Sequence, residues 1–174
     1  MLREILNNIL KKKEAISFPD GFAGSPEDAA KVAALHKRVD RIFRRSLRIR
    51  QVDAGSCNAC EWECTALTNP VYDIQRFGID FVASPRHADV LLVSGPVSRQ
   101  MELALKKTYI ATPEPRLVVA CGDCSIDGGV YKGSYAVANG VANIIPVDYS
   151  IPGCPPSPIR IIEGLLAMLE KLSE

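Results

Sequence analysis

Six cysteines in three groups are the residues of this sequence whose type and spacing could do chemistry. They are Cys57, Cys60 and Cys64 in GSCNACEWEC, Cys121 and Cys124 in VACGDCSIDGG, and Cys154 in IPGCPPSP. Glycine or proline lies close to each group, as is common in loops that approach a bound group. Thiols in such positions could form disulfides, bind zinc, act as a redox dithiol or hold an iron–sulfur cluster.

The composition argues against a disulfide framework. The chain has 174 residues, 47% hydrophobic and 24% charged, which is typical of one globular domain, and its net charge of +1 gives no sign of nucleic-acid binding. The start, MLREILNNILKKK, lacks the apolar run and cleavage site of a secretory signal, and no later stretch is apolar and long enough to span a membrane. We therefore expect a cytosolic chain, in which thiols stay reduced.

The spacing of the cysteines favours an iron–sulfur cluster over a zinc ion. Two C-x-x-C pairs, at 57–60 and 121–124, form the usual pattern of a four-cysteine zinc site, but about 60 residues separate them and Cys154 is left without a role. A redox dithiol needs only one such pair. A cubane cluster takes four thiolates, often from separate loops, and neighbouring glycine amides can donate hydrogen bonds to its sulfides. A zinc-stabilised interaction module remains the alternative from another class.

Short apolar runs alternate with helical segments after residue 46. Strands are predicted at 47–53, 79–84, 88–95, 116–122 and 143–148, and helices at 61–68, 97–111 and 157–172. This alternation predicts an α/β domain with a parallel sheet over residues 47–174. Each cysteine group follows a predicted strand, and the carboxyl ends of parallel strands share one edge of a sheet. We therefore expect the groups to meet there.

Residues 1–46 are predicted to be a helical extension that docks to a partner or to a membrane arm. An amphipathic helix covers 1–13, and a second helix starts near Ser25-Pro26. Seven Lys or Arg and a single acid lie between Lys37 and Arg50. This basic run would suit anionic headgroups or an acidic partner, although a solvated helix face is the commoner explanation.

Four motifs, in this order, resemble a known family. GSCNACEWE, FGIDFVASPRHADVLLVSGPVS, CGDCSIDGGVY and VDYSIPGCPPSP are similar to the small iron–sulfur subunit of respiratory complex I, the 20-kDa-type subunit. They also resemble its relatives in group 4 energy-converting [NiFe] hydrogenases and formate hydrogenlyases. The resemblance runs from about residue 49 to 170. It implies a flavodoxin-like α/β fold and one [4Fe–4S] cluster that exchanges electrons with the active site of a large catalytic subunit.

The resemblance also implies a ligand set, namely Cys57, Cys60, Cys124 and Cys154. Cys64 and Cys121 have no counterpart in the family pattern, so either could replace a named ligand or pack beside the cluster. Complex I subunits typically carry adjacent cysteines at the positions of Ala59 and Cys60. The C-x-x-C form found here favours the hydrogenase branch, and sulfur-reducing relatives share parts of this pattern.

Other polar and aromatic residues near the motifs have two or more interpretations. Glu63 matches a family acid and could couple proton movement to electron movement, or could be a helix-start acid favoured by the helix dipole. Arg86 and His87 could tune the cluster potential or simply form caps and salt bridges. Trp62 could shield the cluster, face a partner or pack in the core.

The sequence therefore predicts an electron-transfer subunit of an oxidoreductase complex, with no complete active site in this chain. The resemblance implies the cytoplasmic side of a membrane and several partners: a large catalytic hydrogenase-like subunit, a ferredoxin-like iron–sulfur subunit, and membrane-embedded antiporter-like and anchor subunits. The alternatives are a complex I-like subunit that passes electrons to quinone or another acceptor, and the zinc-stabilised module.

Overall fold

A five-stranded parallel sheet organises residues 45–171, the part of the chain that the computed structural model describes. Its strands are β1 (Leu47–Asp53), β2 (Ile79–Phe81), β3 (Val90–Ser94), β4 (Leu117–Cys121) and β5 (Tyr149–Ile151). They lie in the order β2-β1-β3-β4-β5, and every neighbouring pair is parallel. This is the strand order of flavodoxin-like doubly wound sheets. The predicted α/β fold is confirmed, and the predicted helices within 1–44 lie outside the described residues.

The central strands are apolar because both of their faces are covered. All five residues of β3 are buried, as are four of the five residues of β4. β1 alternates instead, with Leu47 and Ile49 buried on one face and Arg48 exposed between them. Buried parallel strands are continuous hydrophobic runs, whereas a strand with one covered face alternates. The continuous apolar runs of β3 and β4 therefore allowed these strands to be predicted from the sequence.

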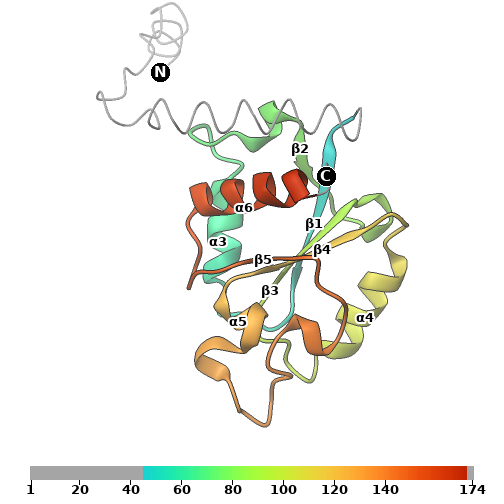
Figure 1. Cartoon of the computed structure of the whole chain (residues 1–174), viewed down its shortest axis with the longest axis vertical. Coiled ribbons are helices and arrows are strands. Elements are labelled where there is room, and N and C mark those ends of the chain that lie inside the picture. Colours follow the sequence, from blue (N-terminus) through green and yellow to red (C-terminus); the bar gives the residue numbers. More distant parts are fainter. Residues whose placement is uncertain (1–44, 172–174) are drawn as a thin grey trace, which may run out of the picture.

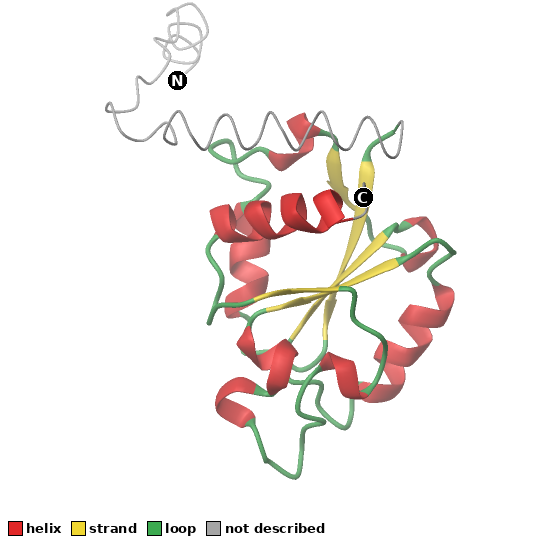
Figure 2. Ribbon diagram, in the orientation of Figure 1, coloured by secondary structure: helices red, strands yellow, loops and turns green. Residues whose placement is uncertain are grey.

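Helices cover both faces of the sheet (Figures 1 and 2). On one face, α3 (Ala59–Ala66) and α6 (Pro158–Lys171) bury Leu67, Ile161 and Leu165 against the inward side chains of β1 and β3. On the other face, α4 (Glu102–Ala111) packs through Leu105 onto Leu91 and neighbouring side chains. The two cores hold the sheet as a rigid support for the loops at its ends.

Short helices fill the connections between strands. These are the five-residue α5 (Asp123–Asp127) and the 3₁₀ turns η1 (Ile74–Phe77), η2 (Pro85–His87), η3 (Gly129–Tyr131) and η4 (Val141–Asn143). No helix is predicted at α5 from the sequence, because five residues are too few to show a helical hydrophobic period. The crossover from β4 to β5 thus consists of α5, η3, η4 and loops, and it carries one of the cysteine groups.

The strand predicted at 143–148 is wrong. Residues 141–143 form η4, and pairing with β4 begins only at Tyr149. The reason is that Ile144, Ile145 and Val147 pack individually against the core on the α4 face. Asp148 then bonds to β4 twice, since its backbone N–H donates to the Val118 carbonyl at 2.9 Å and its carboxylate accepts from the Val118 N–H at 2.7 Å.

Two helix starts also differ from their predictions. α4 begins at Glu102 rather than at 97, because Val97 has a positive φ of 56° and Ser98 forms a bridge with Val137. α3 covers 59–66 rather than 61–68. The earlier start of α3 places Cys60 in its first turn.

Candidate metal centre at the carboxyl edge of the sheet

The three cysteine groups lie at one edge of the sheet, as predicted. Cys57 lies in the loop between β1 and α3, Cys60 in the first turn of α3, Cys124 in α5 just after β4, and Cys154 in the loop after β5. All five strands are parallel, so the ends of β1, β4 and β5 face the same side. Although β5 begins later than predicted, Cys154 still follows its carboxyl end.

The cysteine loops approach one another at this edge, because a Cβ on Gly122 would lie 2.7 Å from the Cys60 sulfur and 3.4 Å from the carbonyl oxygen of Gly153, the residue before Cys154. Burial raises the pKa of Cys124, and the nearby Cys154, Cys57 and Cys60 raise it further by charge repulsion. Cys57 and Cys154 are exposed, while Cys60 and Cys124 are half-buried. Repulsion between thiolates in one cluster is the condition that a bound cation or iron–sulfur group relieves.

Hydrogen bonds tie the ligand loops to one another. The Gly122 N–H donates to the Ile151 carbonyl at 2.8 Å, and the Asp123 N–H donates to the Gly153 carbonyl at 2.9 Å. In return the Asp123 carboxylate accepts from the Gly153 N–H at 2.8 Å. These bonds fix the loop of Cys124 against the loop of Cys154. They join residues about 30 positions apart, so no local sequence signal could have predicted them.

The loop of Cys57 is held separately. The Asp53 carboxylate accepts hydrogen bonds from the N–H groups of Gly55 and Ser56, both at 2.8 Å. Ser56 in turn donates its hydroxyl hydrogen to Glu61 at 2.7 Å, and buried Ser94 at the end of β3 donates to the other Glu61 oxygen. Glu61 therefore joins α3, the cysteine loop and the sheet.

Glycines allow the backbone to approach two of these sulfurs. A Cβ on Gly122 would lie 2.7 Å from the Cys60 sulfur, and one on Gly129 would lie 3.0 Å from the Cys124 sulfur. Both glycines have positive φ, at 92° and 50°. The backbone N–H of Val130 also donates to the Cys124 sulfur, which opposes the rise in its pKa. Amide donors of this kind are typical around iron-bound thiolates.

Cys64 and Cys121 lie behind this group and inside the core. Their exposures are 2% and 0%, and both belong to the buried cluster beneath α3 and α6. The neighbouring thiols of Cys60 and Cys64, and then burial, raise the pKa of Cys121. Their burial separates them from the four cysteines at the surface. A zinc site that used Cys121 would have to draw this side chain out of the core.

Four residues form contacts in the site that were not predicted from the sequence: Ser56, Glu61, Ser94 and Asp123. A helix-start acid and a serine are too common to be signals by themselves, and their partners became visible only in three dimensions. The predicted role of Glu63 remains a prediction: this residue is half-buried on α3, and the contacts to the loop belong to Glu61.

Three other residues singled out from the sequence are exposed, and two of them are also far from the thiols. They are Trp62, which is exposed, and Arg86 and His87, which are exposed and remote. Trp62 is 68% exposed, so the interpretation as a core tryptophan is wrong. Arg86 and His87 are exposed in η2, which precedes β3. The five residues of β3 separate them from the cysteine edge by about 16 Å of strand rise. Their predicted influence on a cluster would have to act over that distance.

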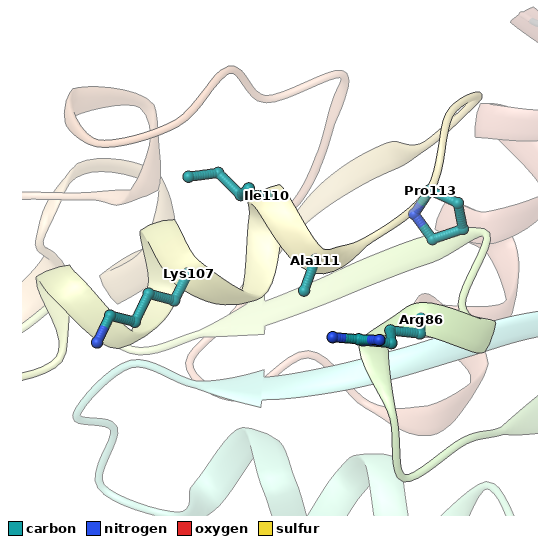
Figure 3. A pocket seen from close by; sticks show the side chains of 5 residues that line it. All are labelled: Arg86, Lys107, Ile110, Ala111 and Pro113. Carbon is teal, nitrogen blue, oxygen red and sulfur yellow. The ribbon is translucent and has the colours of Figure 1, made fainter.

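One hollow among the described residues is also remote from the cysteines. It has a volume of about 560 Å³ and is lined by Arg86, Lys107, Ile110, Ala111 and Pro113. Figure 3 shows its residues on α4, on the loop that follows it and on η2, without any thiol or acid among them. A hollow of about 310 Å³ lies beside α3 and includes Cys64 in its lining.

Four thiolates from three loops suit an iron–sulfur cluster better than a substrate pocket. Within residues 45–171, no three His, Cys, Asp or Glu side chains are arranged to hold a single metal ion. The fit of a cluster therefore rests on the donor set itself: soft thiolate ligands, amide donors beside them and glycines that leave room.

Comparison with known proteins identifies the family. Residues 57–168 match the family described as NADH ubiquinone oxidoreductase, 20 Kd subunit. The chain belongs to this family. The match covers every cysteine group, and it agrees with the predicted resemblance.

Two relatives are named as subunits of a membrane-bound hydrogenase and of a formate hydrogenlyase. The probable membrane-bound hydrogenase subunit mbhJ of Pyrococcus furiosus is 43% identical, over 80% of this chain and 86% of that protein. Formate hydrogenlyase subunit 7 of Escherichia coli is 36% identical, over 97% of this chain and 65% of that protein. These relatives are subunits of oxidoreductase complexes, as predicted.

Solved structures agree on the fold. A chain of the membrane-bound sulfane sulfur reductase, an archaeal respiratory membrane complex, matches with a TM-score of 0.67 and 33% identity, over 76% of this chain and 73% of that one. A chain of an NAD⁺-reducing [NiFe]-hydrogenase matches with a TM-score of 0.56 at 20% identity, over 73% and 93% of the two chains, and shows a shared fold. Among the described residues, none of the helices has the length and apolar character required to cross a membrane.

Proposed function

We propose that this chain is the electron-transfer subunit of a membrane-associated, hydrogenase-like oxidoreductase complex. It would hold one [4Fe–4S] cluster through Cys57, Cys60, Cys124 and Cys154, next to the active site of a large catalytic subunit. The observation that carries the proposal is the location of these four cysteines on three loops at one edge of the parallel sheet. The relatives from hydrogenase and formate hydrogenlyase support the class of complex.

The chemistry that a bound cluster would supply is one-electron transfer at a potential set by its surroundings. The residues of this chain would hold it and exclude water. Asp123 fixes the Cys124 loop against the Cys154 loop, and Glu61 fixes the Cys57 loop against β3. The Val130 N–H, donating to Cys124, would stabilise negative charge on that sulfur.

An exposed apolar rim beside the cysteines is the proposed seat of the large subunit. Trp62 lies two residues after Cys60, and three more exposed apolar residues come after Cys124 in the sequence: Val130, Tyr131 and Tyr135. The exposures of the four are 68%, 79%, 43% and 96% in this order. Aromatic side chains are enriched in protein interfaces, and a partner seated here would cover exposed Cys57 and Cys154. In this arrangement the complex lies on the cytoplasmic side of the membrane, with a ferredoxin-like subunit as electron donor and further subunits in the membrane.

Anaerobic purification with metal analysis tests the cluster. We expect about four iron and four sulfide per full-length chain and a paramagnetic signal after reduction. Cys154→Ser should lose most of the iron and sulfide, because it removes one of four ligands. Cys64→Ser changes a buried thiol that is no ligand, and should keep both. Zinc content that survives Cys154→Ser would overturn the proposal and favour the zinc module built from Cys57, Cys60, Cys121 and Cys124.

The C-x-x-C pair at 57–60 favours the hydrogenase branch of the family, and the large subunit distinguishes the branches further. The structural match to a sulfane sulfur reductase supports a second candidate function, in which the large subunit uses another electron acceptor. A complex that reduces quinone is a further candidate of this kind. Sequencing the large subunit that co-purifies decides between them. Two C-x-x-C motifs that supply nickel ligands would support a hydrogenase, and their absence would support another acceptor.

A further inference from the structure

Helix α4 carries an exposed face that is both apolar and basic. Leu103, Lys107 and Ile110 are spaced four and three positions apart, so they share one face of the helix. Leu103 is 61% exposed, Ile110 is 76% exposed, and Lys107 is exposed between them. Leu105 lies on the other side of the helix and is completely buried in the core. The inner face therefore holds α4 on the sheet, while the outer face presents two large apolar side chains and a cation.

The hollow of about 560 Å³ continues this face at the end of α4. The helix contributes Lys107, Ile110 and Ala111 to its lining, and Pro113 follows the helix. Arg86 comes from η2, which contacts α4. In the view of Figure 3, Ala111 lies between the side chains of Arg86 and Lys107. The hollow thus combines apolar side chains with two cations from separate elements.

The location of the hollow separates it from the proposed seat of the large subunit. η2 precedes β3, and Pro113 precedes β4, so the hollow lies at the amino ends of the strands. The cysteine loops follow the carboxyl ends. A partner that covers the cysteines therefore leaves this hollow free for another one.

Three acids that neighbour this surface in the sequence are already paired with other cations. Asp89 pairs with Arg45 at 2.6 Å, Glu102 with Lys106 at 2.8 Å, and Glu114 with Arg116 at 2.8 Å. Arg116 also donates to the Thr112 carbonyl at 2.8 Å, so the end of α4 has a cation of its own. By contrast, within residues 45–171 neither Arg86 nor Lys107 has an ion pair or a side-chain hydrogen bond. Their charges are available to an anionic partner.

We propose that the outer face of α4 and this hollow bind an acidic peptide segment from a subunit other than the large subunit. Carboxylates of that segment would pair with Arg86 and Lys107, and a bulky apolar side chain would pack against Ile110 in the hollow. A concave site fits a protruding side chain better than it fits the flat surface of a bilayer. The proposal goes beyond the proposed function and does not require the cluster.

Photo-crosslinking in the intact complex identifies the segment. Leu103→benzoylphenylalanine keeps a bulky apolar side chain at the margin of the surface and leaves Arg86, Lys107 and Ile110 in place. The complex is purified anaerobically, irradiated and analysed by peptide mass spectrometry. We expect a crosslinked peptide from another subunit that carries two or more acids near a bulky apolar residue. Crosslinks only to lipid, to the large subunit, to a second copy of this chain or to a peptide without acids would overturn the proposal, as would the absence of any crosslink.

A synthetic peptide with the crosslinked sequence then tests the charges, by fluorescence anisotropy with the full-length protein. The double variant Arg86→Glu, Lys107→Glu should bind the peptide at least about tenfold more weakly, because like charges then face one another. The matched control is Arg160→Glu, Lys171→Glu, which reverses two exposed cations on α6 and changes the net charge equally. Its affinity should stay within about twofold of wild type. A peptide with lysines in place of its acids should bind the first double variant again.

Each contrary result has a distinct meaning. Equal weakening by both double variants would show an effect of net charge alone and would overturn the inference. Failure of the lysine peptide to bind the first double variant would show that no carboxylate pairs with Arg86 or Lys107, with the same consequence. Iron content, measured on the same samples, should be equal in all of them. Wild-type protein that binds the peptide but holds no iron would overturn the proposed function and leave the inference intact.

Discussion

At the scale of single residues, Glu61 is the side chain that links the Cys57 loop to the sheet. It accepts from Ser56 at 2.7 Å and from Ser94, whose exposure is 2%. Without the carboxylate, the Ser94 hydroxyl retains only a 3.4 Å contact with the Val52 carbonyl. Leaving a buried hydroxyl poorly paired costs about 1–3 kcal/mol.

We therefore expect Glu61→Ala to lower the free energy of unfolding by about 1–3 kcal/mol and to loosen the Cys57 loop. Glu63→Ala is the matched control, since it removes a half-buried acid two positions along the same helix. Chemical denaturation of the full-length apoprotein, under anaerobic conditions, measures both. Equal losses for Glu61→Ala and Glu63→Ala would show that Glu61 is an ordinary helix residue.

At the scale of elements, the loops that carry the cysteines depend on close backbone contacts. Gly122 joins β4 to α5 with a φ of 92°, and its position leaves no space for a side chain beside Cys60. Gly133 has a similar φ of 81°, but no atom lies within 4 Å of a Cβ built there. A substitution at either glycine would strain the backbone in a similar way. Only a side chain at Gly122 would also contact the sulfur of a proposed ligand, Cys60.

Gly122→Ala should reduce the iron content of the purified protein by at least about half, because the added methyl group would displace the Cys60 sulfur. Gly133→Ala should retain its iron and lose about 1–2 kcal/mol of stability from the left-handed backbone alone. Metal analysis and thermal unfolding separate the two effects. An unchanged iron content in Gly122→Ala would show that the Cys60 sulfur can move away from β4 and still bind iron.

The same elements show what a sequence can and cannot predict here. The strands β1, β3 and β4 were predictable because their burial gives continuous or alternating apolar runs, and parallel pairing then places their cysteines at one edge. β5 was predicted at the wrong place, because Ile144, Ile145 and Val147 form an apolar run that is typical of a strand. In the structure this segment is not a strand, and its side chains pack against the core on the α4 face. The bonds of Asp123 to Gly153 and of Glu61 to Ser94 join distant residues of common types.

At the scale of the whole molecule, the described part presents two different apolar surfaces at opposite edges of the sheet. Trp62, two residues after Cys60, and Tyr135, in the segment after Cys124, are exposed and belong to the surface where the proposed function seats the large subunit. Ile110, 76% exposed on α4, lines the hollow beside Arg86 at the other edge (Figure 3). If the large subunit covers the cysteines, only the first surface should matter for its binding.

We expect a Trp62→Ser, Tyr135→Ser double variant to weaken binding of the large subunit about tenfold or more, since central aromatic residues contribute about 2 kcal/mol or more to an interface. Ile110→Ser removes an equally exposed apolar side chain from the other edge and should leave binding unchanged. The measurement is the ratio of large subunit to this chain after anaerobic affinity purification. A loss of large-subunit binding with Ile110→Ser alone would show that the interface lies at the opposite edge of the sheet. The exposed thiols would then have to be covered by something other than the large subunit.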